Sequence, residues 1–495
     1  MLLKIAPGGP TPVFRQIQDQ IARLVDEGSL CPGAHLPATR VLAGHLGVNR
    51  STVYRAYQEL WSRGYLEARP GSYSTVRARL RPPGPALGQT PSGFDWAAAA
   101  APAARAAHVG SLRLGARRAA PAATDDLVDF ASLAADGALC PVDELTRSMR
   151  RVLSRRGREV LGYGDPAGYR PLRETLARRL RVHGVAVTAD EILITNGAQH
   201  GLDLAVQLLA GPRRVIAAES PTYAFALPLF RLRQLRVRGI PMRADGLDLD
   251  ALERLLARRR PALLYTIPNF HNPTGITTGQ AHREKLLALC ESRRVPVVED
   301  GFEEELKYFG KAVPPIKSMD RSGIVIYLGT LSKVVFSGLR IGWIAAPREA
   351  IERLLAIHRC GALSGNMLVQ AAVDDFCSAG AYEPYLRRIH RVYRARMQAL
   401  QAGLREHLPA RGVEWTRPAG GCTVWIRVKD RPASREGALL EAARREGVLV
   451  TPGSLFFADE PDGLCLRVSV SGADEGRIAE GCRRLGRALA GVVGG

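Results

Sequence analysis

The sequence predicts an α/β protein of two unequal domains, in which a small helical domain precedes a large body built on a mainly parallel, seven-stranded sheet. Two observations predict this architecture. The chain has 495 residues, too many for a single core. Helical periodicity fills the first part of the chain, whereas from residue 127 to 493 apolar runs alternate with helical patterns. From about residue 385 the body is predicted to form a smaller α+β subdomain.

Residues 11–79 are predicted to form three amphipathic helices and a short hairpin. In the first, TPVFRQIQDQIARLVDEG, apolar residues from Ile17 to Val25 fall on one face. In the third, VNRSTVYRAYQELWSRG, Asn49 or Ser51 can cap the helix, which ends at Gly64. A glycine at position 71 would allow the hairpin turn.

The third helix has the polar N-terminus of a recognition helix, the part that contacts base edges in a major groove. Arg40, at the start of the preceding helix, can contact a phosphate or a base. The candidate DNA-binding residues of the third helix are Asn49, Arg50, Ser51, Thr52 and Tyr54. A packing module without DNA binding is the alternative for a helical domain of this size.

Residues 80–126 are rich in Pro, Ala and Gly. This composition favours an extended, partly disordered linker. Its length is well above that of ordinary loops, so the first domain could dock far from its own body.

One segment of the body sets a lysine among groups that can bind phosphate. It is LGTLSKVVFSGLRIGW, residues 328–343. The amine of Lys333 can form a Schiff base with an aldehyde, while Thr330, Ser332 and Arg340 can neutralise a phosphate dianion. This layout predicts a site for pyridoxal 5'-phosphate.

Two polar turns that follow predicted strands can hold the cofactor ring. In PNFHNPTG, Asn272 can hydrogen-bond the phenolate oxygen. In VPVVEDGF, Asp300 ends a strand, where ligands of open α/β sheets bind, and its carboxylate can keep the pyridine nitrogen protonated. A helix-capping role is the alternative for Asp300.

Two further segments add a phosphate cradle and an aromatic face. ILITNGAQHGLDL is a strand, a glycine turn and a helix, so the N–H groups of Gly197 and Ala198 can cradle phosphate at the helix N-terminus. The ESPTY segment ends at Tyr223, whose ring can stack on the pyridine.

In this order, the motifs resemble those of the fold-type I, class I/II aminotransferases, which use pyridoxal phosphate. The resemblance runs from about residue 129 to the C-terminus. It implies that Tyr163, in LGYGDPAGYRPLRETLARRL, reaches the phosphate bound by the other subunit of a dimer. It also implies that Arg467, in LCLRVSVSG, binds a substrate or effector α-carboxylate; a structural ion pair is the alternative. Lys333 and Asp300 would be the catalytic residues.

The sequence departs from this family at one place. Many relatives carry a tyrosine two or three residues after the pyridine-binding aspartate, and its hydroxyl bonds the cofactor phenolate. Here Asp300 is followed by Gly301, Phe302 and Glu303. Without that hydroxyl, efficient transamination is in doubt, although cofactor binding is not excluded.

The first domain resembles the GntR-type winged helix-turn-helix, through LPATRVLAGHLGVNRSTVYRAYQELWSRGYL. With the aminotransferase-like body, nearly the whole chain resembles the MocR/GabR-type transcriptional regulators. This resemblance implies a domain-swapped homodimer that binds double-stranded operator DNA at promoters and senses pyridoxal phosphate, an amino compound, or both. The alternative function is an active aminotransferase that carries a DNA-binding head.

Composition limits the other possibilities. The formal charge of +21 is consistent with nucleic-acid binding but does not separate it from solvated basic helix faces, including those of the body. Eight scattered cysteines and no His cluster predict neither disulfides nor a metal site, and the absence of a signal or spanning segment favours the cytoplasm. The effector, the operator sequence, and activation versus repression are not predictable.

Overall fold

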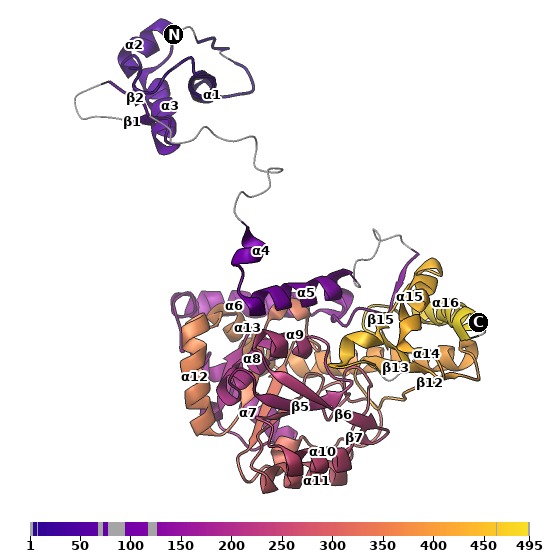
Figure 1. Ribbon diagram of the computed structural model, residues 1–495. Coiled ribbons are helices and arrows are strands. Elements are labelled where there is room, and N and C mark those ends of the chain that lie inside the picture. The colour runs from indigo at the N-terminus through magenta and orange to yellow at the C-terminus, as the bar shows by residue number, and fades with distance from the viewer. Residues whose placement is uncertain are drawn as a thin grey trace. The chain divides into compact units, whose positions relative to one another are not determined.

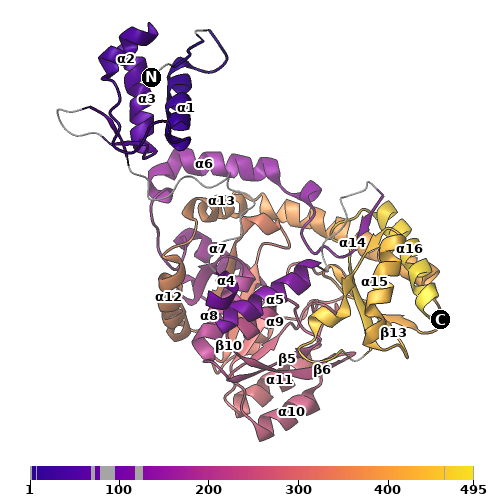
Figure 2. The same ribbon diagram turned by 45° about the horizontal axis from the view of Figure 1, so that its top comes forward.

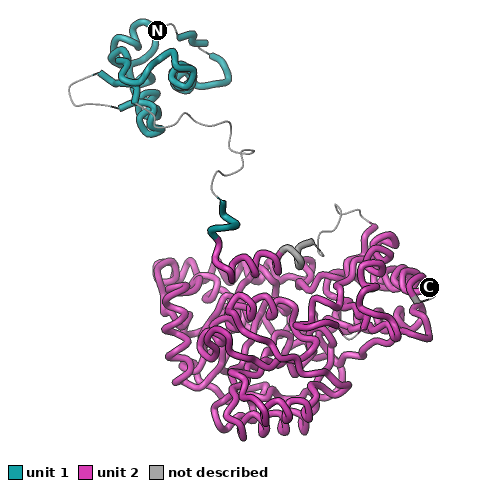
Figure 3. Tube along the Cα trace, viewed as in Figure 1, with its two compact units in different colours: residues 1–99 teal, residues 100–495 magenta. Residues whose placement is uncertain are grey.

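The computed structural model describes residues 3–6, 8–67, 73–77, 95–116, 126–461 and 463–493. The chain divides into two compact units, Met1–Ala99 and Ala100–Gly495 (Figure 3). The division falls within the predicted 80–126 linker, of which residues 80–94 and 117–125 lie outside the described part. Each unit has its own buried apolar core.

The first unit has the three predicted helices and a pair of short antiparallel strands. They are α1 (Val13–Asp26), α2 (Thr39–Leu46), α3 (Arg50–Ser62), β1 (Leu66–Glu67) and β2 (Thr75–Val76). Ile17 and Ile21 of α1 are fully buried against Val53 and Leu60 of α3. Gly47 ends α2 with φ 63°, a left-handed conformation that favours glycine. The predicted hairpin turn at position 71 lies outside the described residues.

Part of the predicted linker is helical. Its helices are α4 (Trp96–Ala99) and α5 (Pro102–Ala116). Alanine is the strongest helix former, so the alanine-rich composition that suggested an extended linker forms helix in these two places. Within the second unit, α5 packs on α9 (Ala226–Leu232).

The body is built on a mainly parallel sheet in the strand order β4-β11-β10-β9-β8-β5-β6-β7. Strands β5, β6 and β7 lie next to one another in Figure 1. Six strands are parallel, β11 runs antiparallel between β4 and β10, and the two-residue β7 extends the predicted seven strands. The bounds are β4 (Ile192–Thr195), β5 (Val215–Ser220), β6 (Arg236–Arg243), β7 (Gly246–Leu247), β8 (Leu264–Thr266), β9 (Val297–Asp300), β10 (Val325–Thr330) and β11 (Gly342–Ala345).

Helices cover this sheet, so most of its strands are buried along nearly their whole length. The exception is β6, next to the edge strand β7, in which exposed and partly buried residues alternate. Two of these helices, α10 and α11, lie side by side (Figure 2). Besides α9, the helices are α6 (Val142–Val160), α7 (Arg170–Val182), α8 (Ala198–Leu209), α10 (Leu249–Arg258), α11 (Gln280–Ser292), α12 (Arg348–Ala362) and α13 (Met367–Ser378). None of the helices in the described residues is long and apolar enough to cross a bilayer.

The C-terminal part forms the predicted smaller α+β subdomain, with an antiparallel sheet in the order β12-β13-β16-β15. Its elements are α14 (Tyr382–His407), β12 (Val413–Trp415), β13 (Thr423–Val428), α15 (Glu436–Arg445), β14 (Val448–Leu449), β15 (Thr451–Pro452), β16 (Leu464–Ser469) and α16 (Glu475–Val493). Short 3-10 helices are η1 (Gly137–Leu139), η2 (Ala189–Glu191), η3 (Ile316–Met319), η4 (Ser337–Leu339), η5 (Ala433–Arg435) and η6 (Gly453–Phe456).

The segment that enters the body is tied to this subdomain. Strand β3 (Val128–Asp129) pairs in parallel with β14. The pairing continues as a hydrogen bond from Phe130 N to Leu449 O, 2.9 Å. The following residues, 131–134, are thereby held against the C-terminal strands.

A buried arginine supports the turn between β8 and α11. Arg283 is fully buried and donates from Nη2 to Pro268 O at 3.2 Å and from Nε to Thr278 Oγ1 at 2.9 Å. Its Nη1 donates to Val313 O at 3.2 Å and Pro314 O at 2.6 Å. One guanidinium therefore joins the start of the PNFHNPTG turn and Thr278, three residues after its end, to the loop before η3.

Replacing this guanidinium should destabilise the body strongly. We expect Arg283→Met to lower the free energy of unfolding by about 3 kcal/mol or more, because several buried carbonyl groups lose their donor. Urea denaturation followed by circular dichroism measures the change. Arg254→Met, at an exposed position of α10, is the matched control and should change stability by less than ~0.5 kcal/mol. Equal effects of the two substitutions would contradict the role of Arg283.

Candidate functional site

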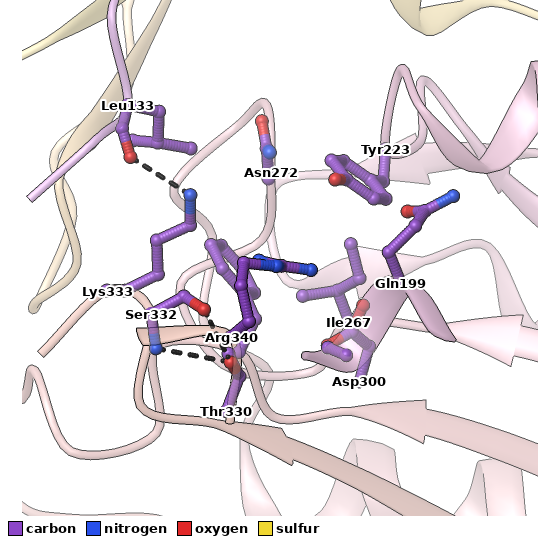
Figure 4. A pocket seen from close by; sticks show the side chains of 12 residues that line it. Leu133, Gln199, Tyr223, Ile267, Asn272, Asp300, Thr330, Ser332, Lys333 and Arg340 are labelled. Atoms are coloured by element: carbon purple, nitrogen blue, oxygen red, sulfur yellow. Dashed lines mark hydrogen bonds between the residues drawn. The ribbon is translucent and has the colours of Figure 1, made fainter. Parts of the chain in front are cut away.

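A cavity of about 90 Å³ lies where the predicted cofactor residues meet, at the carboxyl ends of the parallel strands (Figure 4). All but two of the ten predicted cofactor-binding residues line it. Sequence reasoning did not single out Gln199, Ile267 or Leu133. The lining residues are Leu133, Ala198, Gln199, Tyr223, Ile267, Asn272, Asp300, Phe302, Thr330, Ser332, Lys333 and Arg340.

Lys333 lies three residues after the end of β10 and is half-buried. Its Nζ points to the carbonyl of Leu133 and donates to it at 3.0 Å (Figure 4). The hydroxyl of Thr330 donates to Ser332 Oγ at 3.0 Å and accepts from Ser332 N at 3.2 Å. These bonds fix the turn that carries the lysine.

The N-terminus of α8 and Arg340 form an anion site. Gly197 caps α8 with φ 80°, and Arg340 Nη2 donates to Asn196 O at 2.6 Å, so the guanidinium lies beside the helix start. A Cβ at Gly342 would come within 2.5 Å of Gly197 C, which explains the glycine there. A helix N-terminus next to a guanidinium is suited to a phosphate. Gly197 borders the cavity without lining it, and Ala198 lines it.

Asp300 ends β9 and is 5% exposed. Its Oδ2 accepts from Tyr265 Oη at 2.7 Å, while its Oδ1 is buried and has no hydrogen-bond partner among the described residues. Burial raises the pKa of this carboxyl to about 6. A buried carboxylate oxygen on a cavity wall needs a donor, and a protonated ring nitrogen is such a donor.

Asn272 is held by a buried pair that sequence reasoning missed. Glu219, at the end of β5, accepts from Thr266 Oγ1 at 2.5 Å, and its Oε2 lies 3.2 Å from His271 Nε2. His271 Nδ1 is 2.7 Å from Thr274 Oγ1. These contacts of Glu219 and His271 therefore hold the turn that carries Asn272. The side-chain oxygen of Asn272, Oδ1, is buried and has no hydrogen-bond partner among the described residues. The acid in the otherwise apolar run VIAAES was the available sequence signal.

Phe302 lines the cavity at the place where many relatives carry the phenol. The next residue, Glu303, is 1% exposed, and its Oε2 accepts from Cys422 N at 3.2 Å. Burial raises the pKa of Glu303 to about 7. Of the two positions after Asp300 where relatives have tyrosine, one is thus apolar and the other is a buried acid.

A second cavity, of about 290 Å³, adjoins the first, since Leu133, Tyr223, Asn272 and Lys333 line both. Arg467 of β16 lines this second cavity and is 6% exposed. Its Nη2 donates to Thr451 Oγ1 at 2.8 Å and also to Ala131 O. These two hydrogen bonds hold the Arg467 guanidinium at the wall of the second cavity, which is large enough for a small ligand.

Tyr163 lines neither cavity of its own chain. It is 89% exposed, in the turn after α6. The groove between subunits that its predicted role requires is not a feature of a single chain, so that role stays a prediction.

The predicted DNA-binding residues gather at the start of α3. Asn49 is the cap: its Oδ1 accepts from Ser51 N at 2.9 Å and from Ser51 Oγ at 2.8 Å. Arg40 and Arg50 are exposed, and Arg50 Nε lies 3.5 Å from Thr39 Oγ1. Thr52 is half-buried and Tyr54 is 46% exposed. Asn49 and Ser51 thus stabilise the start of α3, which carries Arg50, whereas Arg40 belongs to α2.

Comparison with known proteins agrees with the fold and with the order of the two domains. Residues 126–485 match the family model of aminotransferase class I and II, and residues 14–76 match that of the bacterial regulatory proteins of the gntR family. These matches define an aminotransferase-like body behind a winged-helix head. The chain belongs to the class I and II aminotransferase family and, more particularly, to the GntR-type regulators in which the two are fused.

Relatives that match over the full length are named as regulators. The uncharacterized HTH-type transcriptional regulator YisV of Bacillus subtilis is 33% identical over 473 residues, 95% of each chain. The probable rhizopine catabolism regulatory protein MocR of Rhizobium meliloti is 28% identical over 96% of this chain and 93% of its own. The two domains of this chain, and their order along the sequence, are thus those of a GntR-type transcriptional regulator.

Relatives that match the body alone are named as enzymes. A 2-aminoadipate transaminase of Thermus thermophilus is 38% identical over 72% of this chain and 88% of its own. The crystal structure of LysN, α-aminoadipate aminotransferase from Thermus thermophilus, complexed with N-(5'-phosphopyridoxyl)-L-leucine, has a TM-score of 0.74 and 34% identity; the match covers 81% of this chain and all of that one. These relatives imply that the cofactor bound in the first cavity is pyridoxal phosphate.

Titration of Asp300 should affect the stability of the cofactor-free protein. Its folded pKa of about 6 is above the ordinary value of 3.8, so the folded state holds an extra proton between these values and loses stability as the pH rises through them. We expect Asp300→Asn to be more stable than the wild type at pH 7 by about 1–3 kcal/mol, and the difference to vanish near pH 4.

Urea denaturation at a series of pH values measures this difference. Asp245→Asn, at an exposed position, is the control and should show no pH-dependent gain. A loss of stability in Asp300→Asn at pH 7 would mean that the carboxylate is stabilised in the fold rather than held at a cost.

Proposed function

We propose that this GntR-type regulator binds pyridoxal phosphate in the first cavity and an amino compound beside it, and that the bound ligands alter its affinity for operator DNA. The observation that carries the proposal is that one cavity is lined by both Lys333 and Asp300, whose buried Oδ1 has no hydrogen-bond partner among the described residues. An amine and a carboxylate placed in this way match the aldehyde and the ring nitrogen of this cofactor.

The proposed contacts follow from the side chains on each wall. Lys333 holds the aldehyde carbon, Asp300 the ring nitrogen, and Asn272 the phenolate oxygen; Tyr223 stacks on the ring. The phosphate is bound by Gly197, Ala198, Thr330, Ser332 and Arg340. When bound, the cofactor supplies an electron-withdrawing ring next to the amine of its ligand.

The second proposed ligand group is a carboxylate on Arg467. A guanidinium binds a carboxylate in a bidentate manner, and burial strengthens the interaction. Because Arg467 and Lys333 line the same cavity, one small molecule can present a carboxylate to the first and an amine to the second. An effector of this kind shifts the regulator toward the conformation that binds it better.

DNA binding and assembly complete the proposal. The exposed Arg40 and Arg50 flank the start of α3, where a recognition helix reads a major groove. A homodimer with exchanged heads would bind two half-sites and would bring Tyr163 of one subunit to the phosphate site of its partner. The exposure of Tyr163, 89%, is suited to such a contact.

A catalytically active aminotransferase is the second candidate function, favoured by the near-complete set of cavity residues. Phe302 argues against it, because no phenol from that position can bond the phenolate oxygen. Repeated turnover with an amino donor and a keto acid would support the enzyme; conversion of one equivalent or less would support the sensor.

Lys333→Ala should abolish covalent cofactor attachment and leave the chain folded, since the half-buried lysine packs little apolar surface. Borohydride reduction followed by mass spectrometry measures the attachment, and thermal unfolding measures the fold. Lys311→Ala, at an exposed position, is the control and should keep the adduct. A reducible adduct in Lys333→Ala would assign attachment to a different lysine.

Arg50→Ala should weaken binding to the DNA upstream of the chain's own gene by about 1–3 kcal/mol if Arg50 contacts a base. Fluorescence anisotropy at fixed salt, with and without pyridoxal phosphate, measures this. Arg15→Ala, exposed on α1, is the control. An equal loss on unrelated DNA would make Arg50 a phosphate contact, and no binding of the wild type in any ligand state would refute the regulator.

A further inference from the structure

The second cavity has a charge pattern that restricts its ligand. Among the described residues that line it, Lys333 and Arg467 are the two charged side chains, and both are cationic. The polar groups beside them are the hydroxyls of Tyr223, Ser337 and Thr451 and the amide of Asn272. Thr451 Oγ1 already accepts from Arg467 and donates to Ala131 O at 3.2 Å.

The remaining wall is apolar. It comes from three separate segments: the stretch after β3, the turn after β5, and the continuous stretch that runs through β14, β15 and η6. Phe456 is 1% exposed, and the Arg467 guanidinium lies 5.6 Å from its ring centre, so one side of the cation is covered by an aromatic face. The apolar lining residues are Ala131, Leu133, Ala134, Ala224, Phe225, Val450, Pro452, Leu455 and Phe456.

We propose that the effector is an α-amino acid with a single carboxylate and an apolar side chain. This inference rests on the proposed function and names the ligand class of its second site. The carboxylate binds Arg467, the amine faces Lys333, and the side chain lies against the wall formed by Leu133, Leu455 and Phe456. The volume of about 290 Å³ is near the lower end of the ~300–1,000 Å³ typical of small-molecule sites, which suits an amino acid.

The same pattern disfavours other amino compounds. A second carboxylate, as in a dicarboxylic amino acid, would be buried without a cation of its own, since Arg467 binds the first carboxylate and Lys333 faces the amine. A second amine, as in a diamino acid, would find no carboxylate among the described lining residues. Compounds without a side chain, such as taurine or γ-aminobutyrate, would leave the apolar wall uncovered and forfeit its contribution.

Calorimetric titration of the cofactor-loaded, full-length protein tests this class directly. The probes are L-norleucine and L-leucine against L-glutamate, L-2-aminoadipate, L-lysine, taurine and pentylamine. We expect the two apolar amino acids to bind about 10- to 200-fold more tightly than each of the others. Tighter binding of a dicarboxylic or diamino compound, or binding of none of the amino acids, would overturn the inference.

A substitution in the wall tests its location. Leu455→Arg should weaken norleucine binding at least about tenfold and improve glutamate binding, because it adds a cation where the side chain ends. Leu440→Arg, at a half-buried position of α15 outside the cavity lining, is the matched control and should change neither. Leu455→Ala, which adds no charge, should weaken norleucine but not alanine. Equal effects of Leu455→Arg and Leu440→Arg would overturn the assignment.

DNA affinity, measured in the same samples, separates this inference from the function on which it rests. Norleucine binding by a protein that never binds its operator would retain the cavity assignment and refute the regulator. Cofactor-dependent DNA binding without amino-acid binding would retain the regulator and refute the assignment.

Discussion

The contact between two glycines, Gly197 and Gly342, is the constraint on which the rest of the body depends. Gly342 begins β11 and is in register with Thr195 of β4 on one side and Thr330 of β10 on the other. A Cβ at Gly342 would meet the backbone of Gly197, so only glycine allows this approach. Because α8 starts just after Gly197 and the lysine turn starts just after Thr330, this register brings a helix N-terminus to the turn of the lysine.

Acidic side chains on β9 and directly after it are buried, and this burial lowers the stability of the folded state. Burial raises the pKa of Glu299, Glu303 and Glu304 to about 7, and that of Asp300 to about 6. Hydrogen bonds recover part of this cost: Glu299 accepts from the backbone of η3 at 2.7 and 2.8 Å, and Glu304 accepts from Asn269 at 2.8 and 3.0 Å. Asp300 Oδ1 has no such partner among the described residues. A ligand in the cavity that donates a hydrogen bond to this oxygen therefore gains a favourable interaction.

Much of the fold and of the first cavity was predictable, because their determinants are local in sequence. A strand followed by a polar turn places Asn272, Asp300 and Lys333 at one edge of a parallel sheet, whatever the details of packing. The roles of Tyr265 and of the apolar wall around Leu455 were not predictable, because the residues that they contact are distant in sequence. Glu219 stood out only as an acid in a buried strand, and its partner His271 could not be inferred from that. Helix α5 shows a different limit: an alanine-rich composition suits both a linker and a helix, and packing on α9 decides between them.

The segment that enters the body at residue 126 makes hydrogen bonds with both cations of the ligand site. Leu133 O accepts from Lys333 Nζ at 3.0 Å, Ala131 O accepts from Arg467 Nη2, and Ser132 O, between them, accepts from Ser471 Oγ at 2.9 Å. A ligand that accepts a hydrogen bond from Lys333 or Arg467 competes with these carbonyl groups for the N–H donors. Occupancy of the cavities and anchoring of the backbone segment 131–133 within the body therefore depend on the same donors, so that each bound ligand competes with this segment.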